Sequence, residues 1–144
     1  MATGTPHVPD SFLYDVAVGN IDLDTDTFKC MLTTSAYTYN RATHTKRSDV
    51  TNEITGTGYT AGGQAITSIV VTKDTTNHKL SIVITPAVWS GATTLTARNL
   101  VVYKSRGGAS SADELVLIDN FSADVSSSGG TFTVSPITIE YTHF

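Results

Sequence analysis

The chain has 144 residues and a formal net charge of −4, and 15% of its residues are charged, against about 25% in an average globular protein. A chain of this length can bury enough apolar surface to fold as one domain. Its basic residues are few and scattered, which excludes a groove for nucleic acid. No apolar run approaches the ~20 residues of a membrane helix, and no N-terminal pattern marks a secretory leader. We therefore expect a soluble protein with no nucleic-acid or membrane partner.

Residues 1–10 predict an extended N-terminal arm outside a single domain formed by residues 11–144. The segment contains Pro6 and Pro9, which hold the backbone extended and remove two N–H donors. It shows no hydrophobic period that would pack it onto its own domain. We therefore expect the N-terminal arm to lie on a partner and to add little to the stability of the isolated protein; the alternative is a frayed terminus with no role.

A short helix is predicted over residues 10–20. Apolar residues recur there on one helical face, Asp10 or Ser11 can cap the first turn, and a glycine follows the last. After this helix the hydrophobic period changes to the alternation of strands. The segment 35–63 is polar and irregular, and we expect one helical turn around residues 48–53.

The rest of the chain carries β-strand patterns separated by polar turns. We predict strands at 27–34, 64–73, 78–85, 95–104, 114–121 and 131–141. Residues 122–130, rich in Ser and Gly, are typical of a loop. Six to eight strands at this spacing predict an all-β, mostly antiparallel fold: a β-sandwich or jelly-roll-like domain with one short N-terminal helix. Residues 64–85 should form a hairpin in which Ile82, Ile84 and Ile66 or its neighbours point inward.

The stretch 51-TNEITGTGYTAGGQAI-66 places four glycines around one tyrosine. Residues 56–61 fit the relaxed dinucleotide-binding pattern G-x-G-x-x-A. That loop must follow a buried strand and open a helix, whose first N–H groups hold the pyrophosphate. Here the preceding residues are polar and the following ones alternate as a strand. We therefore expect a structural loop whose glycines adopt positive φ or pass close to a neighbour. Its members are Gly56, Gly58, Tyr59, Gly62 and Gly63.

Three alternating aspartates, Asp22, Asp24 and Asp26, resemble the opening of a calcium-binding loop. An EF-hand loop needs Gly at its sixth position and Glu at its twelfth, where this chain has Thr27 and Thr33. The segment is therefore either a solvated turn or a looser calcium site. No pair among the four histidines has zinc spacing, so we predict no metal and no cofactor.

The chain contains no recognisable catalytic motif. His44 and His78 can act as acid or base, but their polar surroundings favour exposed residues. Cys30, the only cysteine, lies in an apolar alternation typical of a buried small side chain rather than a reactive thiol. Trp89 is either a core anchor at a strand end or an exposed aromatic that binds sugar or another subunit. The prediction is a protein that is not an enzyme.

A set of motifs runs through most of the chain in a defined order. They are 21-IDLDTDTFKCMLTTSAYTYN-40, 48-SDVTNEITGTGYTAGGQAI-66, Trp89, 97-ARNLVVYKS-105 and 124-DVSSSGGTFTV-134. Together they resemble a family of small virion proteins of tailed bacteriophages. The resemblance covers most of residues 11–134 and is specific in order and spacing. Cys30 and Met31 depart from the aliphatic residues expected at their positions.

The resemblance implies a structural role in the virion and no chemistry. The expected function is that of a capsid decoration (cement) protein, which binds the outer surface of the phage head and stabilises the capsid lattice. Its partners would be the major capsid protein and copies of itself, as a homotrimer, in a virion assembled in the host cytoplasm. The alternative is a tail fibre, tip or adaptor module that contacts a host receptor. A glycan-active enzyme is disfavoured because no pair of acidic residues is singled out.

The expected partner interface consists of the two chain ends. The N-terminal segment has no pattern that would pack it onto its own domain, and residues 140–144 carry aromatic side chains at the other end. Burial against a partner would offset the entropy that these segments lose when they become ordered. The expected interface residues are Pro6, His7, Val8, Pro9, Tyr141 and Phe144.

Overall fold

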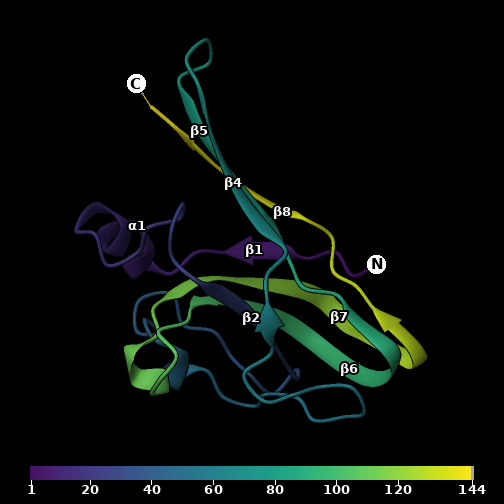
Figure 1. Ribbon diagram of the computed structural model, residues 1–144. Coiled ribbons are helices and arrows are strands. Elements are labelled where there is room, and N and C mark those ends of the chain that lie inside the picture. The colour runs from purple at the N-terminus through teal and green to yellow at the C-terminus, as the bar shows by residue number, and fades with distance from the viewer. Residues whose placement is uncertain (144) are drawn as a thin grey trace.

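Two antiparallel β-sheets form most of the fold in the computed structural model, which describes residues 1–143 (Figure 1). In chain order the regular elements are β1 (Thr5–His7), α1 (Asp10–Ala17), β2 (Phe28–Thr33), β3 (Gln64–Ala65), β4 (Ser68–Asp74), β5 (Lys79–Thr85), β6 (Trp89–Lys104), β7 (Leu115–Phe132) and β8 (Ile137–Thr142), with short 3-10 turns at Arg47–Asp49 and Ser110–Ala112. The strand orders are β1-β7-β6-β2-β3 and β4-β5-β8. The prediction of an all-β, mostly antiparallel, sandwich-like fold with one short N-terminal helix is confirmed.

The longest strands, β6 and β7, form the centre of the five-stranded sheet and curve together (Figure 1). Residues 122–130, predicted as a loop, belong to β7, so that prediction is wrong. Hydroxyl groups join the two strands there: Oγ1 of Thr93 lies 2.8 Å from Oγ of Ser127, and Oγ1 of Thr96 lies 2.8 Å from Oγ of Ser126. Ser and Thr on facing strands stabilise a ladder in this way, and β-bulges accommodate the irregular pairing around the glycines.

The main core lies between the five-stranded sheet and one face of the three-stranded sheet. Strands β4 and β5 form the predicted hairpin, and Ile82 and Ile84 are 1% and 0% exposed, as expected. Ile66 is partly buried against the same core. The hairpin starts later than predicted because Gln64 and Ala65 form β3 and pair with β2 in the other sheet.

The N-terminal segment packs onto the domain, and here the structure differs from the sequence expectation. Ala2 is 3% exposed, its N–H donates to the Thr133 carbonyl at 2.8 Å, and β1 pairs with β7. The segment is extended, but it forms the edge of the five-stranded sheet. Proline is tolerated in an edge strand because one side of the ladder is open, so Pro6 does not exclude the segment from the sheet.

Helix α1 begins without a side-chain cap: Pro9 occupies the N-cap position, and neither Asp10 nor Ser11 caps the first turn. Phe12 is fully buried and attaches the helix to the main core. Gly19 follows the helix with a φ of +83°, as expected of a helix-ending glycine. Within residues 1–143, no helix is long and apolar enough to cross a membrane.

Candidate docking surface

The three-stranded sheet extends beyond the core as a β-arm, made of residues 70–82 and 139–143 (Figure 1). In its ladder Val71 lies opposite Ile82, and Ile82 lies opposite Ile139. Directly opposed residues point to the same face of a sheet, and every second residue along each strand joins them. One face of the β-arm, the inner face, is therefore apolar except for one lysine. Its members are Val71, Lys73, Leu80, Ile82, Ile139 and Tyr141.

The inner face is least covered along β4, at the edge of the sheet. Val71 is 45% exposed, whereas Ile82 and Ile139, which lie in the same row of the ladder, are 1% and 8% exposed. Leu80 and Tyr141 are half-buried. The opposite face carries mainly Ser, Thr and charged side chains, so the inner face is the one that would gain most from being covered.

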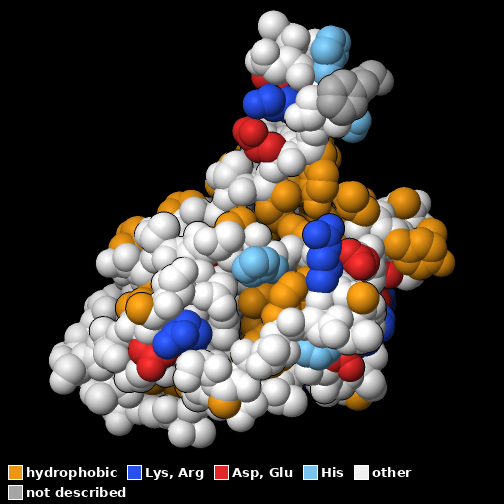
Figure 2. Space-filling model, turned by 180° about the vertical axis from the view of Figure 1, so that it is seen from behind, with side chains coloured by type: hydrophobic (Ala, Val, Ile, Leu, Met, Phe, Trp, Pro, Cys, Tyr) orange, Lys and Arg blue, Asp and Glu red, His pale blue; other side chains and the backbone are white. Residues whose placement is uncertain are grey.

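Helix α1 and the turn after it form a shoulder, residues 13–24, that faces the inner face of the β-arm. The Asp15 carbonyl accepts the N–H of Asn20 at 2.8 Å, which folds the turn back under the helix. This arrangement turns several apolar side chains of the shoulder to the outside. They are Leu13 (50% exposed), Tyr14 (65%) and Val18 (52%). Figure 2 shows hydrophobic side chains at the base of the β-arm and on the shoulder beside it.

Two hollows separate the β-arm from the shoulder. The first has a volume of about 450 Å³. Val71 and Leu80 line it from the β-arm, and Val16 and Leu23 line it from the shoulder. Because its walls are mostly apolar, filling it with apolar side chains would remove further surface from water.

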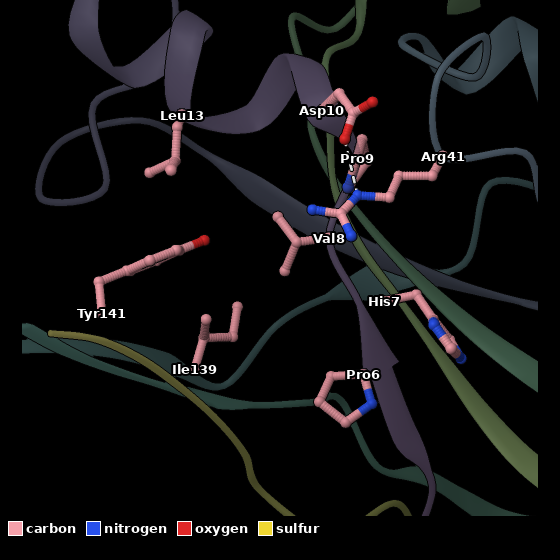
Figure 3. Close-up of a pocket in the computed structure, with 9 residues that line it drawn as sticks. All are labelled: Pro6, His7, Val8, Pro9, Asp10, Leu13, Arg41, Ile139 and Tyr141. Atoms are coloured by element: carbon pink, nitrogen blue, oxygen red, sulfur yellow. Dashed lines mark hydrogen bonds and ion pairs between the residues drawn. The ribbon is translucent and has the colours of Figure 1, made fainter.

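The second hollow, of about 360 Å³, lies beside β8 and collects the residues expected to form a partner interface. Figure 3 shows Val8, Leu13, Ile139 and Tyr141 directed toward one another around it. The ion pair between Arg41 and Asp10, at 2.6 Å, lies at one end. Of the six expected interface residues, Pro6, His7, Val8, Pro9 and Tyr141 all line this hollow, and Phe144 lies outside the described residues.

The inner face and the shoulder carry opposite charges. Lys73 makes no ion pair within residues 1–143. Asp22 and Asp24 are exposed and border the first hollow. The N–H groups of Asp24 and Thr25 donate to Oδ1 of Asp22 at 2.9 and 3.3 Å, and these hydrogen bonds lower the pKa of the Asp22 carboxyl. The shoulder is therefore negatively charged at neutral pH where it faces the lysine-bearing face.

The three alternating aspartates form a turn. Oδ2 of Asp26 accepts the N–H of Asp22 at 2.7 Å and pairs with Nζ of Lys104 at 2.7 Å, so one of the three carboxylates is already neutralised. No group of three or more His, Cys, Asp or Glu side chains in the described part of the chain is arranged to hold a metal ion.

The glycine-rich loop is built into the fold, as predicted. Positive φ angles of +86°, +88° and +74° occur at Gly58, Gly62 and Gly63. A Cβ at Gly63 would overlap the Cys30 carbonyl oxygen, so β2 and the loop can approach this closely only because position 63 has no side chain. The Tyr59 hydroxyl donates to Oε1 of Glu53 at 2.7 Å and accepts the Leu32 N–H at 3.0 Å. A strand, β3, follows the loop where a phosphate-binding loop would require a helix.

Trp89 is a core residue, which decides between the two roles that its sequence position allows. Its side chain is 0% exposed, lies stacked against Tyr59 at 6.2 Å between ring centroids, and meets the Phe132 ring edge-on at 6.1 Å. Cys30 is buried as expected, and burial raises the pKa of its thiol to about 12, which makes the reactive thiolate scarce at neutral pH.

The two histidines that the sequence singled out lie in different parts of the molecule. Nδ1 of His44 lies 3.0 Å from the Tyr37 hydroxyl, and the two rings are stacked. His78 is in the loop at the tip of the β-arm, where its carbonyl accepts the N–H of His143 at 2.7 Å. His44 thus belongs to a cluster of rings, and His78 to the end of the β-arm.

The exposed apolar residues of the β-arm and the shoulder were not predicted as site residues. The sequence does hold one signal for the β-arm: in 69-IVV-71 consecutive residues are apolar, which places apolar side chains on both faces of a strand. Leu13 is 50% exposed, although the helical pattern places it on the same apolar face as Phe12, which is buried. Comparisons with protein-family models, with curated proteins and with solved structures found no match.

Proposed function

We propose that this protein is a structural component of a tailed-bacteriophage virion and acts there as a capsid decoration protein. The observation that carries the proposal is the uncovered inner face of the β-arm, opposite an apolar shoulder. Contiguous apolar surface rimmed by polar side chains is typical of a protein–protein interface. The motifs that resemble virion proteins support the assignment to a phage particle. The β-arm supports a role in which the protein attaches to other proteins of that particle.

A protruding β-arm suits attachment to a lattice because it reaches past the body of its own subunit. A strand rises about 3.3 Å per residue, so the seven residues of β4 extend over about 23 Å. Apolar area removed from water contributes about 25 cal/mol per Å². Each copy that lays its inner face on the head would therefore add free energy of binding and hold neighbouring capsid subunits together.

The second hollow places the chain ends beside the same surface. Pro6, His7, Val8 and Pro9 approach Tyr141 there, so the N-terminal segment and β8 can contact one partner together. The proposed partners are the major capsid protein and further copies of the chain, arranged as a trimer at three-fold positions of the head.

Binding to purified heads that lack decoration tests the proposal. Wild-type protein should bind in many copies over the outer surface, raise the temperature at which the heads open, and appear as regular density in an image reconstruction. Leu13→Asp should weaken binding strongly, because it places a charge between the shoulder and the β-arm. Val88→Asp is the matched control: Val88 is 49% exposed, close to the 50% of Leu13, and borders neither hollow.

The position of bound copies decides between head and tail. Density confined to the tail would replace the decoration role with that of a tail fibre, tip or adaptor module. Absence of binding to any part of the particle, with a folded protein, would contradict both roles.

A further inference from the structure

The outer edge of β4 is an uncovered strand edge. Within residues 1–143, strand β4 pairs only with β5, and the ladder runs without a bulge from Ser68 to Asp74. Val70 and Val71 are 54% and 45% exposed. Proteins usually protect such an edge with proline, a bulge, charged side chains or a covering segment, because its free N–H and C=O groups can pair with another strand. Of these protections β4 carries the charged residues Lys73 and Asp74, so a second chain can pair with this edge if it neutralises the Lys73 charge.

The charges around this edge select a second copy of the chain as the occupant. Lys73 is the one charged residue of the inner face and makes no ion pair within residues 1–143. Asp22 and Asp24 border the first hollow and also lack a cationic partner among the described residues. A twofold axis brings Lys73 of each copy to Asp22 and Asp24 of the other copy. The pair therefore contains this contact between opposite charges twice.

The register follows from the geometry of antiparallel strands. When Thr72 lies opposite Thr72 of a second copy, Val71 lies opposite Lys73 of that copy and shares its face. Val71 borders the first hollow, and the aspartates of the shoulder border the same hollow. The Lys73 side chain of the second copy therefore projects over the hollow toward Asp22 and Asp24.

We propose that residues 70–74 of β4 pair antiparallel with the same residues of a second copy, and join two three-stranded sheets into one sheet of six strands. The inner faces of the two β-arms then form one continuous apolar surface, and the shoulder of each copy faces the inner faces of both β-arms. The pairing rests on the part of the proposed function in which copies bind one another. It is a twofold contact and is distinct from the three-fold contact proposed for the head.

Sedimentation of the full chain over a wide range of concentration measures this contact. The wild-type mass should double as concentration rises, or a trimer should double where the three-fold contact is also present. Lys73→Glu puts like charges at both ends of the pairing and should weaken it about tenfold or more, and Asp24→Lys should do the same. Asp24 is chosen because its carboxylate makes no hydrogen bond within residues 1–143, whereas Asp22 holds the turn.

A mixture of the two variants provides the decisive measurement. In the hybrid pair of Lys73→Glu with Asp24→Lys, both contacts again join opposite charges, so association should return to within about threefold of wild type. That recovery also shows that both variants are folded. Val71→Lys should abolish the pairing, while Val88→Lys, at an equally exposed valine away from the β-arm, should leave it unchanged. Amide hydrogens of residues 70–74 should exchange more slowly in the pair.

Three results would overturn the inference: a wild-type protein that never doubles in mass, association that both charge variants leave unchanged, or a mixture that fails to recover. The binding of the same variants to heads separates this inference from the proposed function. If Lys73→Glu weakens head binding while the isolated protein never pairs, the β-arm binds a capsid subunit and the pairing is refuted. If pairing occurs and no protein binds to heads, the decoration role fails and the pairing stands.

Discussion

The side chain of Asp119 should make the protein less stable as the pH rises from about 4 to about 7. It lies on β7 beneath the N-terminal segment, is 2% exposed, and its Oδ1 has no hydrogen-bond partner within residues 1–143. Burial raises the pKa of Asp119 from 3.8 to about 6. Because the folded-state pKa lies above the unfolded value, the folded protein holds this proton more tightly. The stability gained is complete below about pH 4 and is lost as the pH rises through about 6.

The magnitude follows from the size of the shift. About two pKa units correspond to about 3 kcal/mol of unfolding free energy. Urea unfolding of wild type and Asp119→Asn between about pH 4 and pH 7 should show a difference that grows by about this amount in favour of the variant. A constant offset from the new amide does not affect that slope. A difference between wild type and Asp119→Asn that stays flat with pH would refute burial as the cause.

Three further substitutions or deletions test how the fold is held together. Gly63→Ala should lower the unfolding free energy by more than about 3 kcal/mol, because its Cβ would meet the Cys30 carbonyl. Gly91→Ala is the control: Gly91 has a φ of +87° but open space around it, so the substitution should cost about 1 kcal/mol. Equal losses in urea unfolding would contradict the steric reason. Deletion of residues 1–7 should lower the Tm in calorimetry by about 10 °C or more, because it removes β1 and the buried Ala2. An unchanged Tm would show that this segment does not contribute to the stability of the domain. Burial opposes the charge of Glu114, but hydrogen bonds and ion pairs from Arg106 at 2.7 Å and Lys46 at 3.2 Å lower its pKa to about 2. Glu114→Gln should therefore cost about 2 kcal/mol of unfolding free energy at pH 7 and much less near pH 2, where the carboxyl becomes protonated in the folded protein. An equal cost at both pH values would exclude the ion pairs as its source.

Alternation of apolar and polar residues was sufficient to predict the strands that lie on the main core. The hairpin of β4 and β5 follows from it, because Ile82 and Ile84 must share a face and that face is buried. The glycine-rich loop was predictable for a related reason: the residues on either side of it exclude a phosphate-binding loop, and a structural loop remains. Local patterns of this kind are reliable where one face of a strand meets the core.

Three features could not be obtained from local patterns because they depend on distant segments. Residues 122–130 are polar enough for a loop, and only pairing with Thr93 and Thr96 of β6 makes them a strand. The N-terminal segment has no hydrophobic periodicity that would predict a strand. It becomes a strand because residues 5–7 pair with the free edge of β7. The β-arm is a third case: the sequence predicts its strands, but only the position of α1 and the core shows where the inner face becomes uncovered.

Pairing of β6 with β7 also sets the order in which the chain can fold. A short segment, residues 105–114, joins these strands, so their pairing closes a short loop at a small cost in chain entropy. Strands β1 and β8 must come from opposite ends of the described chain to reach β7 and β5. Since non-local pairings form slowly, we expect the β6–β7 ribbon to supply the folding nucleus and β8 to join late. Substitutions that stabilise the pairing of β8 would then slow unfolding and leave the folding rate unchanged. The time for which the β-arm stays folded could therefore be changed without delaying the folding of the five-stranded sheet.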